Sequence, residues 1–363
     1  MNPPSLGASN LRSLVIQAAT QEIAQDDDAT SLDLSGILWM EHINLIVGDL
    51  DLAAAFYLDF LGFSRDPTKS FTHLNLGQQQ FHLAVPKTPE ESVHTIAGSI
   101  GLTVPDLQSV IDRIPQAQEV LQEKTQFEIL KTNLEEGYLT LQGPWGNKFH
   151  IYDLQHDSTY AGASSSSLSQ STRKMEQLHD WGGTHGSHRM AVRQQPGIRY
   201  LELICQKGTS RAIGDFYQQM LHSHGIHSFE KLKQNQSIDM DTDGIALSVG
   251  PGVHIMFVEQ QEEAAPEFYD SWMKAMQGIH ICVYVEDFHG LYQRLAAKHL
   301  IWTNPRFEYL DSCDTWEQAK RSRTLRFRYI LDLETKKPIY ELEHETRPLL
   351  HGQYMKSLQY IPR

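Results

Sequence analysis

One short pattern recurs along this chain and constrains its fold more than any other feature. Residues 42–50, 99–107 and 280–288 read His-Ile-Asn-Leu-Ile-Val-Gly-Asp-Leu, Ser-Ile-Gly-Leu-Thr-Val-Pro-Asp-Leu and His-Ile-Cys-Val-Tyr-Val-Glu-Asp-Phe. Each passage is an apolar run typical of a buried strand, followed by a turn that carries an aspartate. A helix is expected next, because apolar residues then recur at helical spacing from Leu107 and from Phe288. Asp106 and Asp287 lie at the expected helix starts, where a carboxylate can accept hydrogen bonds from free backbone N–H groups.

A fourth copy of the pattern begins near Glu202. The aromatic pair Phe56-Tyr57 lies 14 residues after His42 in the first copy. The pair Phe216-Tyr217 lies 14 residues after Glu202, which puts Glu202 where the first copy has His42. A register that starts at Tyr200 would break this spacing. The copies therefore start near 42, 99, 202 and 280, and such a repeat indicates one structural unit used four times.

After each helix the sequence alternates between apolar and polar residues, which is typical of strands. These segments are 72–76 and 80–85, 138–141 and 148–152, 245–249 and 253–258, and 325–331 and 339–343. Each unit is therefore predicted to be a strand, a helix and about three strands (βαβββ), and the chain to be an α+β protein. A single unit cannot bury the concave face of its sheet, so we expect the units to pair.

Polar segments divide the chain into two halves. The predicted parts are a flexible leader at 1–36, domains at 37–154 and 198–345, a flexible linker at 155–197 and a tail at 346–363. Because few contacts should cross a polar linker, each half is expected to hold two paired units and to fold by itself.

The charge balance argues against two classes of partner. The chain has 31 Lys and Arg residues and 45 Asp and Glu residues, a formal net charge of −14. It should repel phosphate backbones and anionic lipids, so neither nucleic acid nor membrane is an expected partner. There is no apolar run of about 20 residues and no secretory-signal pattern, and three cysteines (Cys205, Cys282, Cys313) form no disulfide framework. We expect a cytoplasmic protein that acts on a small molecule, as a monomer or homodimer; an organelle-targeting segment in residues 1–36 stays open.

The motifs and their order resemble those of the vicinal oxygen chelate superfamily, which includes glyoxalase I, extradiol dioxygenases and fosfomycin- and bleomycin-resistance proteins. The four units, with His or Glu opening a first strand and Phe-Tyr 14 residues on, carry the resemblance. The segment Gly146–Tyr152 is similar to the closing-strand pattern Gly-Asn-x-Ile-Glu-Leu-Tyr, with His150 in place of glutamate. Pro338–Leu342 keeps that glutamate as Glu341. The resemblance implies paired glyoxalase-like domains, but a fold of this kind hosts many reactions.

In that family the first and last strands of paired units supply the ligands of a divalent metal ion. Carried over, these positions hold His42, His82, Ser99 and His150 in the N-terminal half, and Glu202, His254, His280 and Glu341 in the C-terminal half. The C-terminal set is favoured, because two imidazoles and two carboxylates neutralise an ion such as Fe(II), Mn(II), Ni(II), Co(II) or Zn(II). His42, His82 and His150 would form a second site without a carboxylate. Hydrogen-bonded core histidines and rim carboxylates are the alternative interpretation.

The resemblance implies an enzyme whose metal ion binds two adjacent oxygens of a small substrate. A ligand carboxylate, Glu341 or Glu202, would then accept a proton. Glu343 shares the strand face of Glu341 and is its rival as ligand. Lyase or isomerase chemistry and oxygenation both remain open.

An insertion at 302–323 precedes a strand on which Arg326 and Arg328 alternate with apolar residues. These two arginines are predicted to bind an anionic substrate group, the alternative being a solvent-facing edge protected by charge. The alternative functions are a metal-free binding protein of the bleomycin-resistance type and a structural protein in which both sites have decayed.

Overall fold

The structure is a computed structural model. It describes residues 36–66, 72–135, 137–153, 196–223, 225–230, 242–250, 253–260, 271, 273, 274 and 276–354. The expected leader up to residue 35, the linker up to 195 and the tail from 355 lie outside the described residues. Among the described helices, none is both long and apolar enough to cross a membrane.

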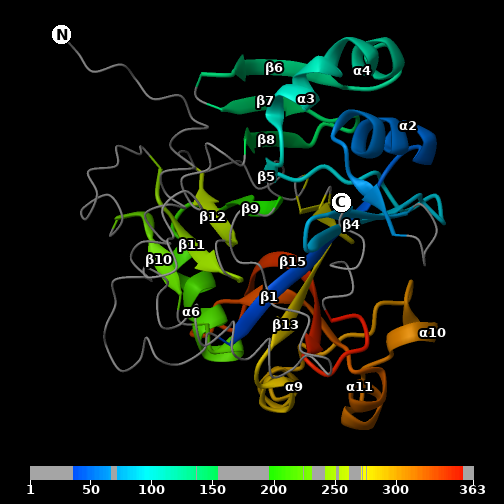
Figure 1. Ribbon diagram of the computed structural model, residues 1–363. Coiled ribbons are helices and arrows are strands. Elements are labelled where there is room, and N and C mark those ends of the chain that lie inside the picture. The colour runs from blue at the N-terminus through cyan, green and yellow to red at the C-terminus, as the bar shows by residue number, and fades with distance from the viewer. Residues whose placement is uncertain are drawn as a thin grey trace, which may run out of the picture.

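The four repeats form four structural units (Figure 1). Unit 1 contains β1 (Ile37–Ile46), α2 (Leu50–Ala54), η2 (Ala55–Phe60), β2 (Ser64–Arg65), β3 (His73–Leu76) and β4 (Gln79–Ala84). Unit 2 contains β5 (Gly98–Val104), α3 (Leu107–Asp112), α4 (Ile114–Leu121), β6 (Glu128–Asn133), β7 (Tyr138–Gln142) and β8 (Lys148–Asp153). Unit 3 contains β9 (Gly197–Cys205), α6 (Ser210–Leu221), β10 (Ile226–Ser228), β11 (Gly244–Ser248) and β12 (His254–Glu259). Unit 4 contains β13 (His280–Val285), α9 (Phe288–Ala296), α10 (Glu308–Asp311), α11 (Trp316–Ser322), β14 (Leu325–Leu331) and β15 (Pro338–Pro348).

Aspartates begin the helices of three units, as the sequence indicates. The side chains of Asp49, Asp106 and Asp287 accept hydrogen bonds from the backbone N–H groups of Leu52, Gln108 and Gly290. Each carboxylate satisfies a donor that the first helical turn leaves free. Unit 4 differs from the others, because the insertion forms α10 and α11 where units 1 to 3 have a short strand (β2, β6, β10). The expected α+β class with paired units is confirmed.

The units pair differently from the expectation. The seven-stranded sheet, which we call the first sheet, has the order β14-β15-β13-β1-β4-β3-β2 and joins units 1 and 4. The eight-stranded second sheet has the order β10-β11-β12-β9-β5-β8-β7-β6 and joins units 2 and 3. In each sheet the opening strands of two units lie antiparallel at the centre, β1 with β13 and β5 with β9. Each sheet therefore draws strands from both halves of the chain, and pairing within a half is not what the structure has.

The two units within each half, 1 with 2 and 3 with 4, also touch, mainly through helices. The ring of Phe60 in η2 packs on Phe127 of unit 2, and Arg113 Nε donates to the backbone oxygen of Phe60 at 2.7 Å. Helix α6 of unit 3 contacts β14 of unit 4, where Phe216 packs against Phe327. The opening strands of the two units in each half therefore pair with units of the other half.

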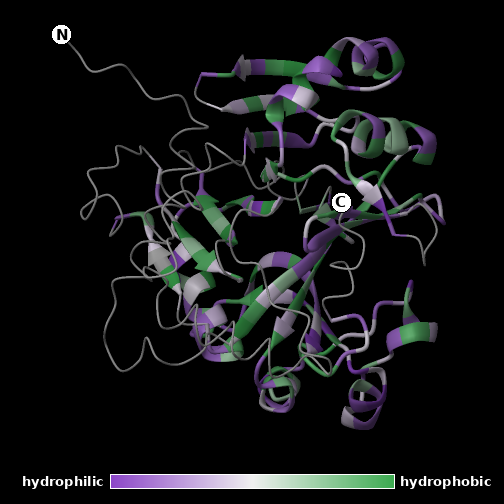
Figure 2. Cartoon of the chain, in the orientation of Figure 1, coloured by the Kyte–Doolittle hydropathy of each residue, from purple (hydrophilic) through white to green (hydrophobic). Residues whose placement is uncertain are grey.

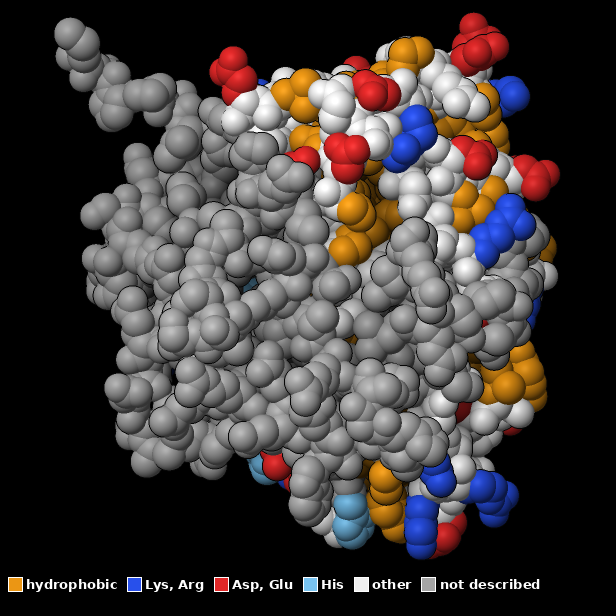
Figure 3. Space-filling model, in the orientation of Figure 1, with side chains coloured by type: hydrophobic (Ala, Val, Ile, Leu, Met, Phe, Trp, Pro, Cys, Tyr) orange, Lys and Arg blue, Asp and Glu red, His pale blue; other side chains and the backbone are white. Residues whose placement is uncertain are grey.

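A single apolar core runs through both sheets. Figure 2 shows hydrophobic and hydrophilic residues mixed along helices such as α4, which packs against η2, and α9, which contacts α6 and β15. On the face in Figure 3, described side chains of both charges lie among hydrophobic ones. The core therefore couples all four units.

Candidate metal centre

Polar residues cross the middle of the first sheet, where a sheet face normally packs apolar side chains. Directly opposite positions on neighbouring strands share a face of the sheet. One such row holds Gln80, His42, Cys282, Glu345 and Arg326, and the next holds His82, Asn44, His280 and Glu343. All except His82 are buried. Because unpaired polar groups are costly in such a place, these side chains must be satisfied by one another or by a bound group.

Two imidazoles and a carboxylate converge in these rows. His280 Nε2 lies 3.4 Å from Glu345 Oε2, and His42 Nε2 lies 3.7 Å from the same oxygen. One potential ligand atom of each residue lies within 4.8 Å of the others. Two ligands about 2.1 Å from an ion, at a tetrahedral angle, are themselves about 3.4 Å apart. The spacing of His42, His280 and Glu345 thus fits a two-histidine, one-carboxylate metal centre.

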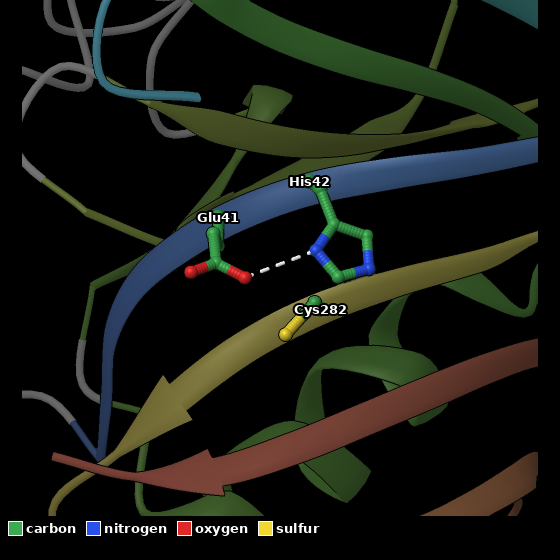
Figure 4. Close-up of side chains that lie close together, drawn as sticks. All are labelled: Glu41, His42 and Cys282. Atoms are coloured by element: carbon green, nitrogen blue, oxygen red, sulfur yellow. Dashed lines mark hydrogen bonds and ion pairs between the residues drawn. The ribbon is translucent and has the colours of Figure 1, made fainter. Parts of the chain in front are cut away.

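A strand irregularity fixes the orientation of His42. The β1–β13 pairing shifts register between Met40 and His42, so Glu41 also reaches the cluster. Glu41 Oε2 lies 3.1 Å from His42 Nδ1. Figure 4 shows the two side chains side by side on β1, with Cys282 on the neighbouring strand β13. A proton on Nδ1 that bonds to Glu41 leaves the Nε2 lone pair free for a metal ion.

The Nε2 atom of His42 is the main reason why the cluster fits a metal ion. The residue is 0% exposed, and among the described residues this nitrogen has no hydrogen-bond partner. A buried imidazole held at one nitrogen and unsatisfied at the other is the arrangement expected of a metal ligand.

Two guanidinium groups flank the carboxylate of Glu345. Arg326 Nη2 bonds to Oε2 at 2.7 Å, and Arg347 pairs with Oε1. Burial by itself would raise the pKa of Glu345, but Arg326 and Arg347 outweigh burial and hold this pKa well below its usual value. The pKa of Glu41 is also lowered: burial opposes this, while Arg347, His42 and Tyr284 favour the charged form. Both carboxylates are therefore negative at neutral pH.

The cluster as a whole has more acidic than basic groups. Its carboxylates are Glu41, Glu343, Glu345 and Asp311, all at least nine-tenths buried. Two guanidinium groups, of Arg326 and Arg347, face them. With every group ionised the excess is two negative charges, which a divalent ion would compensate.

Two imidazoles of the cluster, those of His280 and His82, favour their neutral forms. Burial lowers the pKa of His280, against the opposing effect of Glu345. Burial, with repulsion from His42, holds the pKa of His82 well below its usual value. The His82 ring stacks on His42 at 3.6 Å between centroids, and its Nε2 lies 2.8 Å from Gln80 Oε1. Neutral imidazoles can ligate a metal ion without first losing a proton.

The insertion of unit 4 covers the centre. Asn304 Nδ2 donates to both oxygens of Glu343 at 3.0 and 2.8 Å, and Asp311 Oδ2 accepts from Arg326 Nη2 at 2.6 Å. The Phe307 ring lies edge-on to His280 at 5.5 Å and under the Arg326 guanidinium at 4.7 Å. The insertion is therefore part of the site rather than a surface decoration.

A cavity of about 320 Å³ adjoins the covered centre. Asn44, Glu343 and Phe307 border both the cavity and the polar rows. The remaining walls include Ile46, Lys274, Met276, Trp302, Arg306, Arg328 and Glu341. This volume is at the small end of ligand pockets and suits a small organic molecule.

The structure divides the favoured metal set between the two sheets. His280 and Glu341 lie in the first sheet, whereas Glu202 and His254 lie in the second. The four do not converge, because unit 3 pairs with unit 2 and unit 4 with unit 1. Glu341 lines the cavity, and its carboxylate lies 3.9 Å from the guanidinium group of Arg328.

The second predicted set is divided in the same way. His42 and His82 lie in the first sheet, and Ser99 and His150 in the second. Ser99 lies opposite Glu202 on neighbouring strands. The centre described above therefore takes one histidine from each predicted set, His42 and His280.

The second sheet has an aromatic group at its centre. A side chain at Gly101 would meet the Tyr200 ring at 2.2 Å, so that ring lies directly over the glycine. The hydroxyl groups of Tyr200 and Tyr152 are 3.0 Å apart, and His150 Nδ1 contacts Thr140 Oγ1 at 3.2 Å. Tyr200 thus shares the face of Glu202, two residues on, and fills space that a metal centre would need.

Of the two predicted arginines, only Arg328 borders the cavity. Arg326 is 2% exposed and pairs with three carboxylates of the cluster. Sequence reasoning missed Glu345 and Glu41. The alternation of Glu341, Glu343 and Glu345 signals the first, whereas only the β1 irregularity reveals the second.

Comparison with known proteins finds a family match in the N-terminal part of the chain. Residues 39–151 match the Glyoxalase/Bleomycin resistance protein/Dioxygenase superfamily. The match covers less than half of the chain and agrees with its resemblance to vicinal oxygen chelate proteins. No curated protein matches the chain.

Solved structures of this class are similar over most of their length. Glyoxalase I from Zea mays is 11% identical, covers 88% of this chain and 95% of its own, and has a TM-score of 0.45. A putative dioxygenase from Bacillus subtilis is 14% identical, with coverages of 89% and 90% and a TM-score of 0.41. A mutant 4-hydroxymandelate synthase from Streptomyces coelicolor is 16% identical, with coverages of 87% and 93% and a TM-score of 0.28. With TM-scores below 0.5 these similarities carry no argument about function.

Proposed function

We propose that this chain is a metal-dependent enzyme of the glyoxalase and dioxygenase type, with its ion held by His42, His280 and Glu345. The observation that carries the proposal is the buried Nε2 of His42, which faces Glu345 while Glu41 lies at the opposite nitrogen. The match of residues 39–151 to the Glyoxalase/Bleomycin resistance protein/Dioxygenase superfamily supports the same chemistry.

A divalent ion at this centre would polarise adjacent oxygens of a small substrate, or as Fe(II) would activate dioxygen. The chain's own residues provide the setting. Glu41 orients His42, while Arg326 and Arg347 fix the carboxylate of Glu345. Phe307 lines the cavity and packs edge-on to His280, so the centre lies next to the space in which a substrate would bind.

Glu341 is retained as the proton-transfer group, but not as a metal ligand. It lines the cavity, and burial raises its pKa against the opposing effect of Arg328. A carboxyl whose pKa lies closer to neutrality exchanges protons with a substrate more effectively. Glu202 is no longer proposed for this role, because it lies in the second sheet.

The test is the metal content of the purified chain. After incubation with Fe(II), Mn(II), Co(II), Ni(II) or Zn(II) and removal of free ions, we expect about one ion per wild-type chain by mass spectrometry. His42→Ala and His280→Ala should each lose the ion, whereas His254→Ala, on the second sheet, should keep it. Circular dichroism of each variant controls for folding.

A wild-type chain that holds no ion would contradict the proposal and favour the metal-free ligand-binding alternative. Loss of the ion in His254→Ala but not in His42→Ala would place the centre in the second sheet.

A further inference from the structure

Most charges around the cavity already have partners. Arg306 Nη1 bonds to both oxygens of Glu91 at 2.5 Å, and its Nη2 donates to the backbone oxygen of Val85 at 2.9 Å. Glu343 is held by Arg326 and Asn304. These groups form the walls of the cavity and have little capacity left for a ligand.

Arg328 is different. Its guanidinium carbon lies over the Trp302 ring at 4.9 Å and over the Tyr329 ring at 4.6 Å. Its one ion pair among the described residues, with Glu341, is long at 3.9 Å, and the side chain is 30% exposed. The two rings hold the guanidinium in place while its N–H donors are not used in short hydrogen bonds. Such a group is prepared to bind a carboxylate with two parallel hydrogen bonds.

Two further features support an anion at this place. Lys274 borders the same cavity and has no ion pair among the described residues. Burial raises the pKa of Glu341, which disfavours a negative charge beside Arg328. The positive charge of Arg328 is therefore only partly compensated.

The rest of the cavity suits an apolar, flat molecule. Trp302 and Phe307 provide aromatic walls, and Ile46 and Met276 provide aliphatic ones. Phe307 also contacts His280, so a ligand anchored at Arg328 would extend toward the metal centre.

We infer that the cavity binds a small aromatic carboxylic acid, with its carboxylate on Arg328 and its ring between Trp302 and Phe307. This inference gives the substrate class of the proposed function. It rests on that function only for the end of the ligand that lies away from Arg328 and toward the metal centre. The carboxylate anchor itself needs no metal ion.

The experiment uses benzoate as probe and benzamide as its neutral counterpart of the same shape. Binding to the full-length chain is measured by calorimetry in the presence of EDTA, so that no ion can hold the carboxylate. We expect wild type to bind benzoate about 10- to 100-fold more tightly than benzamide, the range for a charge-assisted pair. Arg328→Gln should lose this preference without changing benzamide binding, and Arg328→Lys should keep part of it.

Arg321→Gln, on the exposed side of α11, is the matched control and should bind like wild type. The inference is overturned by equal affinity of wild type for the two probes, by no benzoate binding at millimolar concentration, or by an Arg328→Gln variant that keeps the preference. Metal content is measured on the same samples. Benzoate selectivity in a chain that holds no metal would support the anchor while refuting the metal centre, so the two failures are distinguishable.

Discussion

Arg326 should be among the most costly residues to replace in this protein. It is 2% exposed and makes four hydrogen bonds of 2.6 to 2.9 Å to the carboxylates of Asp311, Glu343 and Glu345. Arg326→Met keeps much of the side-chain volume but leaves three carboxylates without their shared cation. Removing one partner from a buried ion pair costs about 3–5 kcal/mol, and we expect a loss of that size in the free energy of unfolding.

The assay is urea unfolding followed by circular dichroism, with EDTA present so that no ion replaces the lost charge. Arg328→Met, two residues along the same strand, is the control. Arg328 has only a 3.9 Å ion pair and a partly exposed side chain, so its replacement should cost less than about 1 kcal/mol.

The loss should also depend on pH. In wild type, Arg326 and Arg347 lower the pKa of Glu345. The stability that this pairing contributes is therefore fully present above the pKa of Glu345 in the unfolded chain, and it is lost as pH falls through the pKa in the folded chain. Without Arg326, burial dominates and the carboxylates take up protons more readily. The difference between variant and wild type should therefore shrink from pH 7.5 to pH 5. Equal costs for Arg326→Met and Arg328→Met, or a difference independent of pH, would refute the reasoning.

Three further outcomes are expected. Fragments 1–154 and 196–363 should fold only when they are produced together, because each sheet contains strands of both fragments. Co-purification of the two fragments tests this. A native circular dichroism spectrum from either fragment alone would contradict it. Glu41→Gln should weaken metal binding about 10- to 100-fold, measured by competition with a chelating dye, because Glu41 orients His42. Glu202→Gln, on the second sheet, should leave metal binding unchanged. Equal effects of the two substitutions would argue against the proposed centre. Burial lowers the pKa of His344 to about 3, so wild type should lose about 3 kcal/mol of its free energy of unfolding as pH falls from 6.5 to 4. In urea titrations at several pH values, His344→Gln should show a smaller loss. An equal loss in the variant would show that His344 is not the cause.

Local features of the fold could be predicted well from the sequence. The opening strands near 42, 99, 202 and 280 appear as β1, β5, β9 and β13, because each is a short apolar run bounded by a turn. The helix starts at Asp106 and Asp287 follow from N-capping, which involves only residues of the first turn. The strands β2 and β10 were not located, since they have only two and three residues, and β6 was missed because most of its six residues are exposed and show no apolar alternation.

Partner choice between units could not be predicted in this way. All four opening strands offer similar edges, so no local pattern says which two will join. The choice is made by contacts between residues far apart in sequence, such as the packing of η2 on unit 2 and of α6 on β14. Because the units pair across the two halves, the sequence assigned His42 and His280 to different sites, although both belong to the proposed centre.

The sequence alone thus determined the four units, their first strands and helix starts, and the two histidines, because those depend on residues close along the chain. Tertiary structure decided the carboxylate. Alternation puts Glu341, Glu343 and Glu345 on one face, and only the register of β15 on β13 sets Glu345 opposite Cys282, which in turn lies opposite His42. A register is fixed by the packing of whole strands, so the position of Glu345, the third proposed ligand, follows from the assembled sheet and not from any segment of it.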